Sequence, residues 1–320
     1  MGLTENATLP DPPAAAGMPA DVTTDVLADA PADVPTNVLA DFPAPPASPA
    51  PRLPTSARLP INRCNLPAVI LGGLTYQQHP VALKIDGVRD FHRDLFKILA
   101  PLTCQDERAA YFIDYMTVHF CLEDLEEAGF TPGPRKKYRC NANYLRMMRG
   151  WSFDSDGREG AVLKHWVETR FGLLARHHGG PLDGRDSDAY HAYLVQGSRG
   201  LYATNALEAQ LDLLYTYCQC ELERAYPGQS HLKLYRGINR IDEHEVLARQ
   251  DGQRYQVLLN NLNSFTSERE RADEFGDYIL ETEVPLAKVF FYNRLLPGML
   301  KGEDEYVVVG GLYDVRISTF

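Results

Sequence analysis

The first sixty residues contain no lysine and almost no aromatic residue, yet they hold thirteen of the chain's 22 prolines. A segment so poor in large apolar side chains cannot bury enough surface to offset the entropy lost on ordering. We therefore expect residues 1–60 to form a disordered, acidic tail rich in proline and alanine. Within it, PADVTTDVLADA (19–30) recurs as PADVPTNVLADF (31–42), but two copies are fewer than a solenoid needs.

Other absences narrow the function further. No run of about eighteen apolar residues is present, and the N-terminus has neither the basic start nor the apolar core of a secretory signal, so neither a membrane span nor export is expected. The six cysteines lack the spacing of metal ligands, which favours reduced thiols in a cytoplasmic protein. A net charge of -11 at pH 7 disfavours nucleic acid as a partner, because phosphate binding needs a basic surface.

The middle of the chain, residues 61–228, is expected to be mainly helical, because apolar residues return every three or four positions. The pattern is clearest from Leu207 to Leu222, where one apolar stripe follows Thr204, the expected N-cap. Weaker versions of the same pattern occupy 106–128, 158–175 and 187–196.

From residue 229 onward the chain changes to short apolar or alternating runs separated by turns, such as HLKLYRGIN, QVLLNNLNSF, AKVFFYN and EYVVVGG. These runs predict a β-rich, largely antiparallel region over 229–320. The capping-box pattern that runs from Ser267 to Glu270 predicts one short helix directly after NSFT. The predicted fold class is therefore α+β, with a helical N-terminal layer packed on a C-terminal β region.

Two places in the β-rich region carry polar side chains that a structural strand does not need. Arg236, in LYRGIN, is expected on the strand face of Leu232 and Leu234. Its guanidinium suits either a structural ion pair or a diphosphate, and Gly237 would let the backbone come close to such a ligand. The motif SFTS (264–267) joins a strand to the short helix, so its hydroxyls serve either as helix caps or as ligands.

A third polar place precedes the apolar strand 306–309, where the chain reads Gly-Glu-Asp-Glu (302–305). Glu303 and Glu305 are two positions apart, so both carboxylates are expected on one face of the strand. Acidic residues beside a strand also suit a charged cluster that protects a sheet edge.

Taken in this order, Arg236, the SFTS motif and the Gly-Glu-Asp-Glu segment resemble the sequence pattern of the Arg-Ser-Glu ADP-ribosyltransferases, the cholera-toxin-like clan. The likeness covers about ninety residues, from 230 to 320. The phrases YRG, NSFTSERERADEFGD and KGEDEYVVVGG, behind a helical region of this size, are most similar to the dinitrogenase reductase ADP-ribosyltransferases of nitrogen-fixing bacteria. The resemblance implies that the β region is a mixed or antiparallel split β-sandwich of the ADP-ribosyltransferase type.

The chain departs from the family pattern at two points. The usual Ser-Thr-Ser motif fits a register that starts at Ser264 or at Phe265, and the distance onward to Ala272 and Phe275 favours Ser264. The turn over 293–302 also lacks the aromatic residue that many relatives place there for the protein substrate.

The resemblance implies that NAD is the co-substrate and that no metal is required. Glu305 would bond a ribose hydroxyl and stabilise the oxocarbenium-like centre that forms as nicotinamide leaves. Glu303 would orient and deprotonate the acceptor arginine, whose guanidinium has a pKa above about 12. Ser264 would hold Glu305 and the nicotinamide ribose. Arg236 would bind the phosphates.

Two further residues are implied as NAD contacts, Gly237 beside the nicotinamide amide and Thr266 in the Ser-x-[ST] motif. The narrower likeness also implies partners. The protein substrate would be dinitrogenase reductase, the iron protein of nitrogenase, modified on one arginine near its iron-sulfur cluster so that nitrogen fixation stops. The nitrogen-signalling protein PII would be the regulator, and the helical region is a candidate surface for both partners.

Two other enzyme classes fit the sequence less well. A Rossmann dehydrogenase needs G-x-G-x-x-G between a strand and a helix, and the sequence does not supply it. A metal hydrolase built on His165, His177, His178 and His191 lacks helical ligand spacing, and the histidine pair before GGP is expected in a solvated turn. An arginine-specific transferase with another protein target, or a non-catalytic NAD-binding or protein-binding module, remains an alternative.

Overall fold

The computed structural model describes residues 51–123, 143–201, 206–240, 244–250, 252–299 and 304–319. The chain divides into two units at residue 50, and every described residue belongs to the second unit. Residues 1–50 of the expected tail and the expected cap Thr204 lie outside the described residues. The prediction of disorder is wrong for the end of the tail, because Leu53 and Ala57 are buried in the hydrophobic core.

Helices fill the first part of the described chain, as the helical periodicity predicts. Three of the predicted helices correspond to α5, α7 and α8, and the Leu207 stripe corresponds to α9. The residue before α9 is Ala206, so this helix begins later than an N-cap at Thr204 would place it. None of the described helices is long and apolar enough to cross a membrane. The helices are α1 (Ala68–Leu71), α2 (Leu74–Gln78), α3 (Val88–Phe91), α4 (Arg93–Leu99), α5 (Gln105–His119), α6 (Tyr144–Phe153), α7 (Arg158–Phe171), α8 (Asp188–Leu201) and α9 (Leu207–Ala225).

Two buried ion pairs fix α9 against its neighbours. Arg108 of α5 donates both Nε and Nη2 to the carboxylate of Glu221, at 2.7 and 2.6 Å. Arg170 of α7 makes the same kind of paired contact with Asp212, which also accepts the indole N–H of Trp166 at 2.7 Å. Two N–H groups of a guanidinium donate in parallel to the two oxygens of a carboxylate, so each pair holds its helices in one relative orientation.

The described part of the β region contains six strands, and all of their pairings are antiparallel. For the described residues, this observation confirms the α+β class. Of the two predicted arrangements, mixed or antiparallel, the described strands follow the antiparallel one. The strand order is β2-β3-β1-β4-β6-β5, and β3 pairs with β6 as well, so β3, β1, β4 and β6 form a closed circuit. The strands are β1 (His231–Ile238), β2 (Glu245–Arg249), β3 (Arg254–Thr266), β4 (Tyr278–Pro285), β5 (Val289–Tyr292) and β6 (Glu305–Ser318).

Strand β6 continues past the two glycines that end the predicted run EYVVVGG. The neighbouring strand β3 explains why a glycine is needed there. A Cβ atom added to Gly310 would lie 1.7 Å from the carbonyl oxygen of Asn260, where β3 forms a bulge between Leu259 and Leu262. Only a residue without a side chain fits beside that bulge. The glycines therefore let β6 follow the bent β3 instead of ending the strand.

Two local predictions differ from the structure. The short helix α10 (Arg269–Asp273) lies where it was predicted, but its N-cap is Glu268 and not Ser267. The turn is instead supported by Thr266, whose Oγ1 accepts from the Glu268 N–H at 3.2 Å. Strand β2 was not predicted, because its residues are exposed or half-buried and carry no clear alternation.

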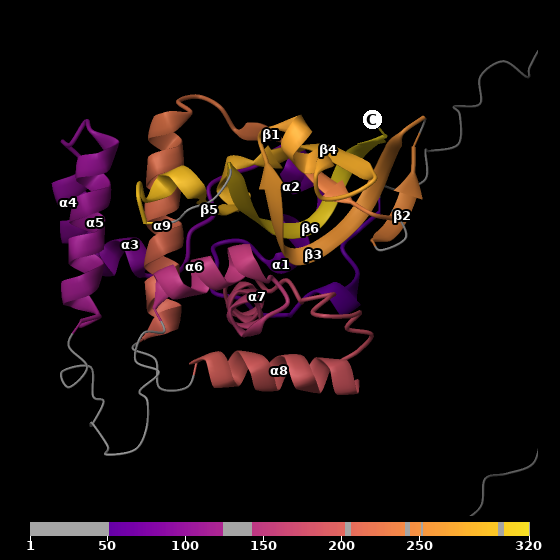
Figure 1. The fold of residues 1–320 in the computed structure, drawn as a ribbon, viewed down its shortest axis with the longest axis horizontal. Helices are drawn as coiled ribbons and strands as arrows, with labels where there is room; N and C mark the ends of the chain where they lie inside the picture. Colours follow the sequence, from indigo (N-terminus) through magenta and orange to yellow (C-terminus); the bar gives the residue numbers. More distant parts are fainter. Residues whose placement is uncertain are drawn as a thin grey trace, which may run out of the picture. The chain divides into compact units, whose positions relative to one another are not determined.

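The helices form layers beside the sheet, as Figure 1 shows. Helix α7 lies against β3, and α9 stands beside β5. Helix α8 packs on α7, on the side away from the sheet. The helical and β-rich segments share one hydrophobic core, to which Phe112, Trp166 and Phe290 all belong. Helices α6 and α7 therefore have fixed positions relative to the ends of the strands.

A lysine is buried within this core. Lys288, between β4 and β5, is fully buried and donates to the carbonyl oxygen of Gly310 at 2.8 Å. Its Nζ lies 4.5 Å from the ring centroid of Tyr313 and 5.8 Å from that of Tyr76. Burial lowers the pKa of the Lys288 ammonium from 10.5 to about 7.

The stability of the fold should therefore depend on pH through Lys288. Above pH 7 the folded protein has released a proton that the unfolded chain still binds, so the free energy of unfolding rises with pH. Between pH 7 and pH 9 the wild type should gain about 2 kcal/mol relative to Lys288→Met, measured by urea unfolding. Because the other groups titrate in both proteins, the difference between wild type and Lys288→Met isolates the contribution of Lys288. A constant difference between the two proteins at both pH values would contradict the lowered pKa.

Candidate functional site

Three of the predicted catalytic residues meet at the end of the sheet. Arg236 lies on β1, and its Nη1 donates to the backbone oxygen of Ser264 on β3 at 2.8 Å. The hydroxyl of Ser264 donates to Oε1 of Glu305, the first residue of β6, at 2.6 Å. A guanidinium, a hydroxyl and a carboxylate from three separate strands are thus linked through Ser264.

Strand register explains why these residues meet. Thr266 lies opposite Tyr235 of β1 and also opposite Glu305 of β6. Ser264, two positions before Thr266, and Arg236, one position after Tyr235, are therefore brought to the same corner of the sheet. Phe265 points into the core and is 3% exposed, so the hydroxyl that reaches Glu305 is that of Ser264.

Gly237 and Thr266, the two other predicted NAD contacts, have structural neighbours. A Cβ atom added to Gly237 would lie 2.1 Å from the carbonyl oxygen of Ala272, so the glycine lets α10 pack on β1. The Thr266 hydroxyl supports the start of α10. These contacts explain the two residue types without a ligand, and the NAD contacts of both residues remain predictions.

Two residues of α6 also reach the carboxylate, and neither was predicted as a site residue. The indole Nε1 of Trp151 donates to Ser264 Oγ at 2.9 Å and to Glu305 Oε1 at 3.2 Å. The hydroxyl of Ser152 donates to Glu305 Oε2 at 2.9 Å. The available signal was the polar phrase WSFDSDG (151–157) directly after a helical pattern, which contains one of the chain's two tryptophans.

Lys164 and His244 are close enough to Arg236 for its charge to lower their pKa values. Burial lowers the pKa of Lys164, the ion pair with Asp156 opposes this shift, and the nearby guanidinium of Arg236 lowers the pKa further. Burial lowers the pKa of His244 to about 4, and the charges of Arg236 and His177 add to that effect. His244 is therefore neutral at pH 7, and the guanidinium of Arg236 supplies positive charge that favours an anionic ligand at this end of the sheet.

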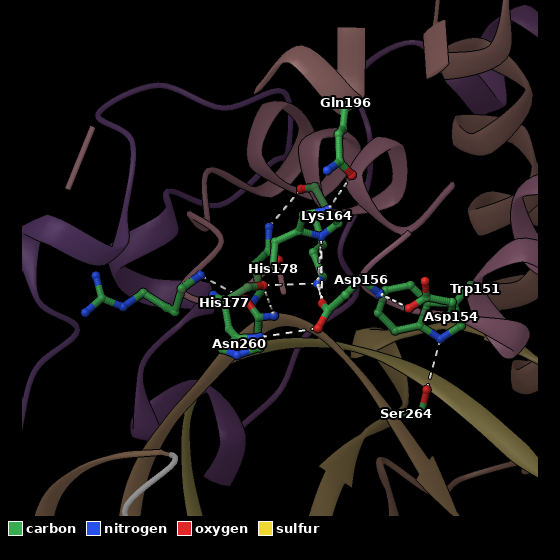
Figure 2. A network of polar contacts seen from close by, with 11 residues as sticks. Trp151, Asp154, Asp156, Lys164, His177, His178, Gln196, Asn260 and Ser264 are labelled. Atoms are coloured by element: carbon green, nitrogen blue, oxygen red, sulfur yellow. Dashed lines mark hydrogen bonds and ion pairs between the residues drawn. The ribbon is translucent and has the colours of Figure 1, made fainter. Parts of the chain in front are cut away.

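A polar network extends from this corner to α7 and α8, as shown in Figure 2. Lys164 Nζ donates to Asp156 Oδ1 at 2.6 Å and lies 3.3 Å from Nδ1 of His178. The Nε2 of His178 lies 3.0 Å from Gln196 Oε1, so the tautomer with the proton on Nε2 satisfies both contacts. His178 is 8% exposed, and the expected solvated turn is therefore wrong for this histidine.

The fourth predicted catalytic residue, Glu303, lies outside the described residues. Its neighbour Asp304 has a φ of +46° and its carboxylate accepts from Arg294 at 2.7 Å. Because Asp304 is in the left-handed region, the chain is not extended there, and β6 begins only at Glu305. The alternation of side chains along a strand therefore does not apply across this position.

Among the described residues, neither a metal site nor the cavity beside Lys84 coincides with this corner of the sheet. Among residues 51–123, 143–201 and the later described ranges, no group of three His, Cys, Asp or Glu side chains is arranged to hold a metal ion. A cavity of about 760 Å³ lies elsewhere, and its lining includes Lys84, Arg89, Tyr215 and Leu286. That lining includes none of the predicted site residues.

The donor set at the corner fits the chemistry of a dinucleotide. The guanidinium of Arg236 can bind a diphosphate, and the carboxylate of Glu305 can accept a bond from a sugar hydroxyl. A carboxylate held near an anomeric carbon also stabilises positive charge on the sugar ring. The arrangement therefore suits cleavage of a glycosidic bond in a phosphorylated ligand.

Comparisons with known proteins agree with this chemistry. The family model described as dinitrogenase reductase ADP-ribosyltransferase (DRAT) matches residues 61–317. The chain is similar to the NAD(+)-dinitrogen-reductase ADP-D-ribosyltransferase of Rhodospirillum rubrum, with 42% identity over 260 residues that cover 80% of this chain and 94% of the relative. No solved structure matches the chain.

Proposed function

Because the chain belongs to the dinitrogenase reductase ADP-ribosyltransferase family, we propose that it transfers ADP-ribose from NAD to an arginine of dinitrogenase reductase. The family match covers most of the chain, including the helical segment, and the R. rubrum relative is named for this reaction. We also propose that the strands adopt the ADP-ribosyltransferase fold, a proposal supported by the antiparallel sheet and the position of Glu305 at its corner.

The observation that carries the proposal is the contact of Ser264 with both Arg236 and Glu305. In the proposed mechanism, Arg236 binds the diphosphate of NAD. Glu305 accepts the ribose hydroxyl, and its negative charge stabilises the oxocarbenium-like centre as nicotinamide leaves. Ser264 holds the carboxylate in place for this step.

Transfer to arginine needs a second carboxylate, and we propose Glu303 for this role. A guanidinium has a pKa above about 12 and must lose a proton as it attacks the sugar carbon. Its nitrogen forms the new bond to the anomeric carbon, nicotinamide departs with the bonding electrons, and Glu303 accepts the proton. Without an acceptor protein, water attacks the same carbon and NAD is hydrolysed.

The test is incubation of the full chain with purified dinitrogenase reductase and NAD labelled in the adenylate part. We expect label on the reductase, release of nicotinamide, and loss of label when the acceptor arginine is replaced. Label that appears only on other proteins would reject the target but keep the transferase. NAD binding without nicotinamide release would indicate a non-catalytic module.

The resemblance to relatives that PII controls adds one arm to this experiment. We propose that PII acts on this enzyme, with the helical segment as a candidate surface. Labelling of dinitrogenase reductase should therefore change when PII is added to otherwise identical reactions. Equal labelling rates with and without PII would remove the regulator from the proposal and leave the transferase reaction intact.

A further inference from the structure

We infer that Trp151 and Ser152, at the C-terminal end of α6, are positioning residues that orient the carboxylate of Glu305. This inference rests on the proposed function, because it concerns the same carboxylate during NAD cleavage. It extends the site into the helical segment, beyond the three strands that hold Arg236, Ser264 and Glu305.

The carboxylate of Glu305 accepts three hydrogen bonds. Ser264 Oγ and Trp151 Nε1 donate to Oε1, at 2.6 and 3.2 Å, and Ser152 Oγ donates to Oε2 at 2.9 Å. Because both oxygens are bonded, the carboxylate cannot rotate without breaking at least one contact. A carboxylate has about four acceptor positions, so Oε2 keeps room for a ribose hydroxyl.

The indole also sets the direction of the serine proton. An indole N–H can only donate, and Trp151 Nε1 donates to Ser264 Oγ at 2.9 Å. The single hydroxyl proton of Ser264 is therefore directed at Glu305, as the 2.6 Å distance indicates. Trp151 thus fixes both the carboxylate and the hydroxyl that holds it.

Helix α6 is itself held in place. Its N-cap Asn143 accepts from the Arg146 N–H at 3.0 Å, and the Arg146 side chain pairs with Glu159 of α7 at 3.3 Å. A Cβ atom added to Gly150 would lie 2.4 Å from Cβ of Glu159, so the two helices touch directly before Trp151. The end of α6 therefore cannot shift far from Glu305 without separating from α7.

A preorganised carboxylate favours the transition state, because no reorientation is needed when charge develops on the sugar. Loss of an α6 donor should then lower kcat more than it changes the binding of NAD. A merely structural role for Trp151 would lower stability and leave kcat per folded molecule unchanged.

The chain offers a matched control for the tryptophan. Trp166 is also buried, and its indole also donates to a carboxylate, that of Asp212 at 2.7 Å, but it lies on α7 within the helical core. Trp151→Phe and Trp166→Phe remove the same atoms from buried sites. Ser152→Ala removes the second donor, and Ser152→Thr keeps a hydroxyl at that position.

The experiment measures kcat and KM for nicotinamide release from NAD by the full chain. Trp151→Phe and Ser152→Ala should each lower kcat by about 10- to 100-fold, with KM changed by less than about threefold. Ser152→Thr should recover most of the rate lost in Ser152→Ala, and Trp166→Phe should keep kcat. An equal kcat for Trp151→Phe and Trp166→Phe, or a change in KM alone, would overturn the inference.

A second measurement does not depend on activity. The chain has two tryptophans, so Trp166→Phe leaves Trp151 as the sole tryptophan and its fluorescence reports the contact with Glu305. Adding Glu305→Gln to this protein should shift the emission. An unshifted emission would overturn the inference even in an active enzyme. If Glu305→Gln shifts the emission but the wild type releases no nicotinamide, the contact of Trp151 with Glu305 stands. Its role in NAD cleavage and the proposed function would then both be rejected.

Discussion

Glu305→Gln should abolish both NAD hydrolysis and ADP-ribose transfer, with kcat lowered by about 100-fold or more. The amide keeps the size of the side chain but removes the charge that stabilises the oxocarbenium-like centre. The substitution should spare the fold, because the amide oxygen can still accept from Ser264 and the Ser152 hydroxyl can turn to accept from the amide nitrogen. Nicotinamide release and label on dinitrogenase reductase are the two measurements.

A matched acid on the same sheet controls for this substitution. Glu281 of β4 lies opposite Tyr235 of β1 and pairs with Lys233 at 2.6 Å. Glu281→Gln should keep both activities. If Glu305→Gln labelled the reductase at a rate near that of the wild type, the role given to Glu305 would be wrong.

Glu303→Gln should separate the two activities, with transfer to arginine lost by about 100-fold and part of the NAD hydrolysis retained. Water can attack the sugar without a dedicated base, whereas a guanidinium with a pKa above about 12 cannot readily lose its proton unaided. The ratio of labelled reductase to released nicotinamide measures this separation directly.

The adjacent acid provides the control for Glu303. Asp304 has a φ of +46°, a conformation that asparagine tolerates, and its carboxylate pairs with Arg294. Asp304→Asn should therefore keep the ratio of transfer to hydrolysis. A parallel loss of both activities in Glu303→Gln would show that Glu303 serves bond cleavage and not the acceptor.

Part of the site could be predicted because its residues lie in short phrases with a fixed order. Arg236, Ser264 and Glu305 each stand at a strand end, and antiparallel pairing of the strands brings them to one corner. The alternation of LYRGIN and the continuous apolar run after Glu305 were visible in the sequence. The register that joins them, set by pairing across long separations, was not.

The contribution of α6 could not be predicted, because it depends on how a helix packs on the sheet. The polar phrase WSFDSDG (151–157) is a local signal, but it does not distinguish Trp151 and Ser152 from a core tryptophan and a helix-end serine. His178 shows the same limit, since a Gly-rich neighbourhood predicts a turn but does not reveal that Lys164 and Gln196 enclose the ring. Tertiary contacts decide such cases.

The differences within the strands have similar causes. Gly310 and its neighbour would mark a turn in most sequences, yet β6 passes through them. A glycine is needed at position 310 because the bulge of β3 at Asn260 leaves no room for a side chain. Gly237 was predicted to let a ligand approach the backbone, and its contact with α10 gives a second reason for a glycine there, so the NAD contact stays a prediction. Glycine in a strand indicates close approach but does not identify what approaches.

The central claim is that Arg236, Ser264 and Glu305 grip one NAD molecule, and the most direct test is a crystal structure of the Glu305→Gln protein with NAD. We expect the diphosphate on the guanidinium of Arg236 and a hydroxyl of the nicotinamide ribose bonded to the side chain at position 305. NAD bound instead in the cavity beside Lys84 and Arg89, away from that corner of the sheet, would contradict it.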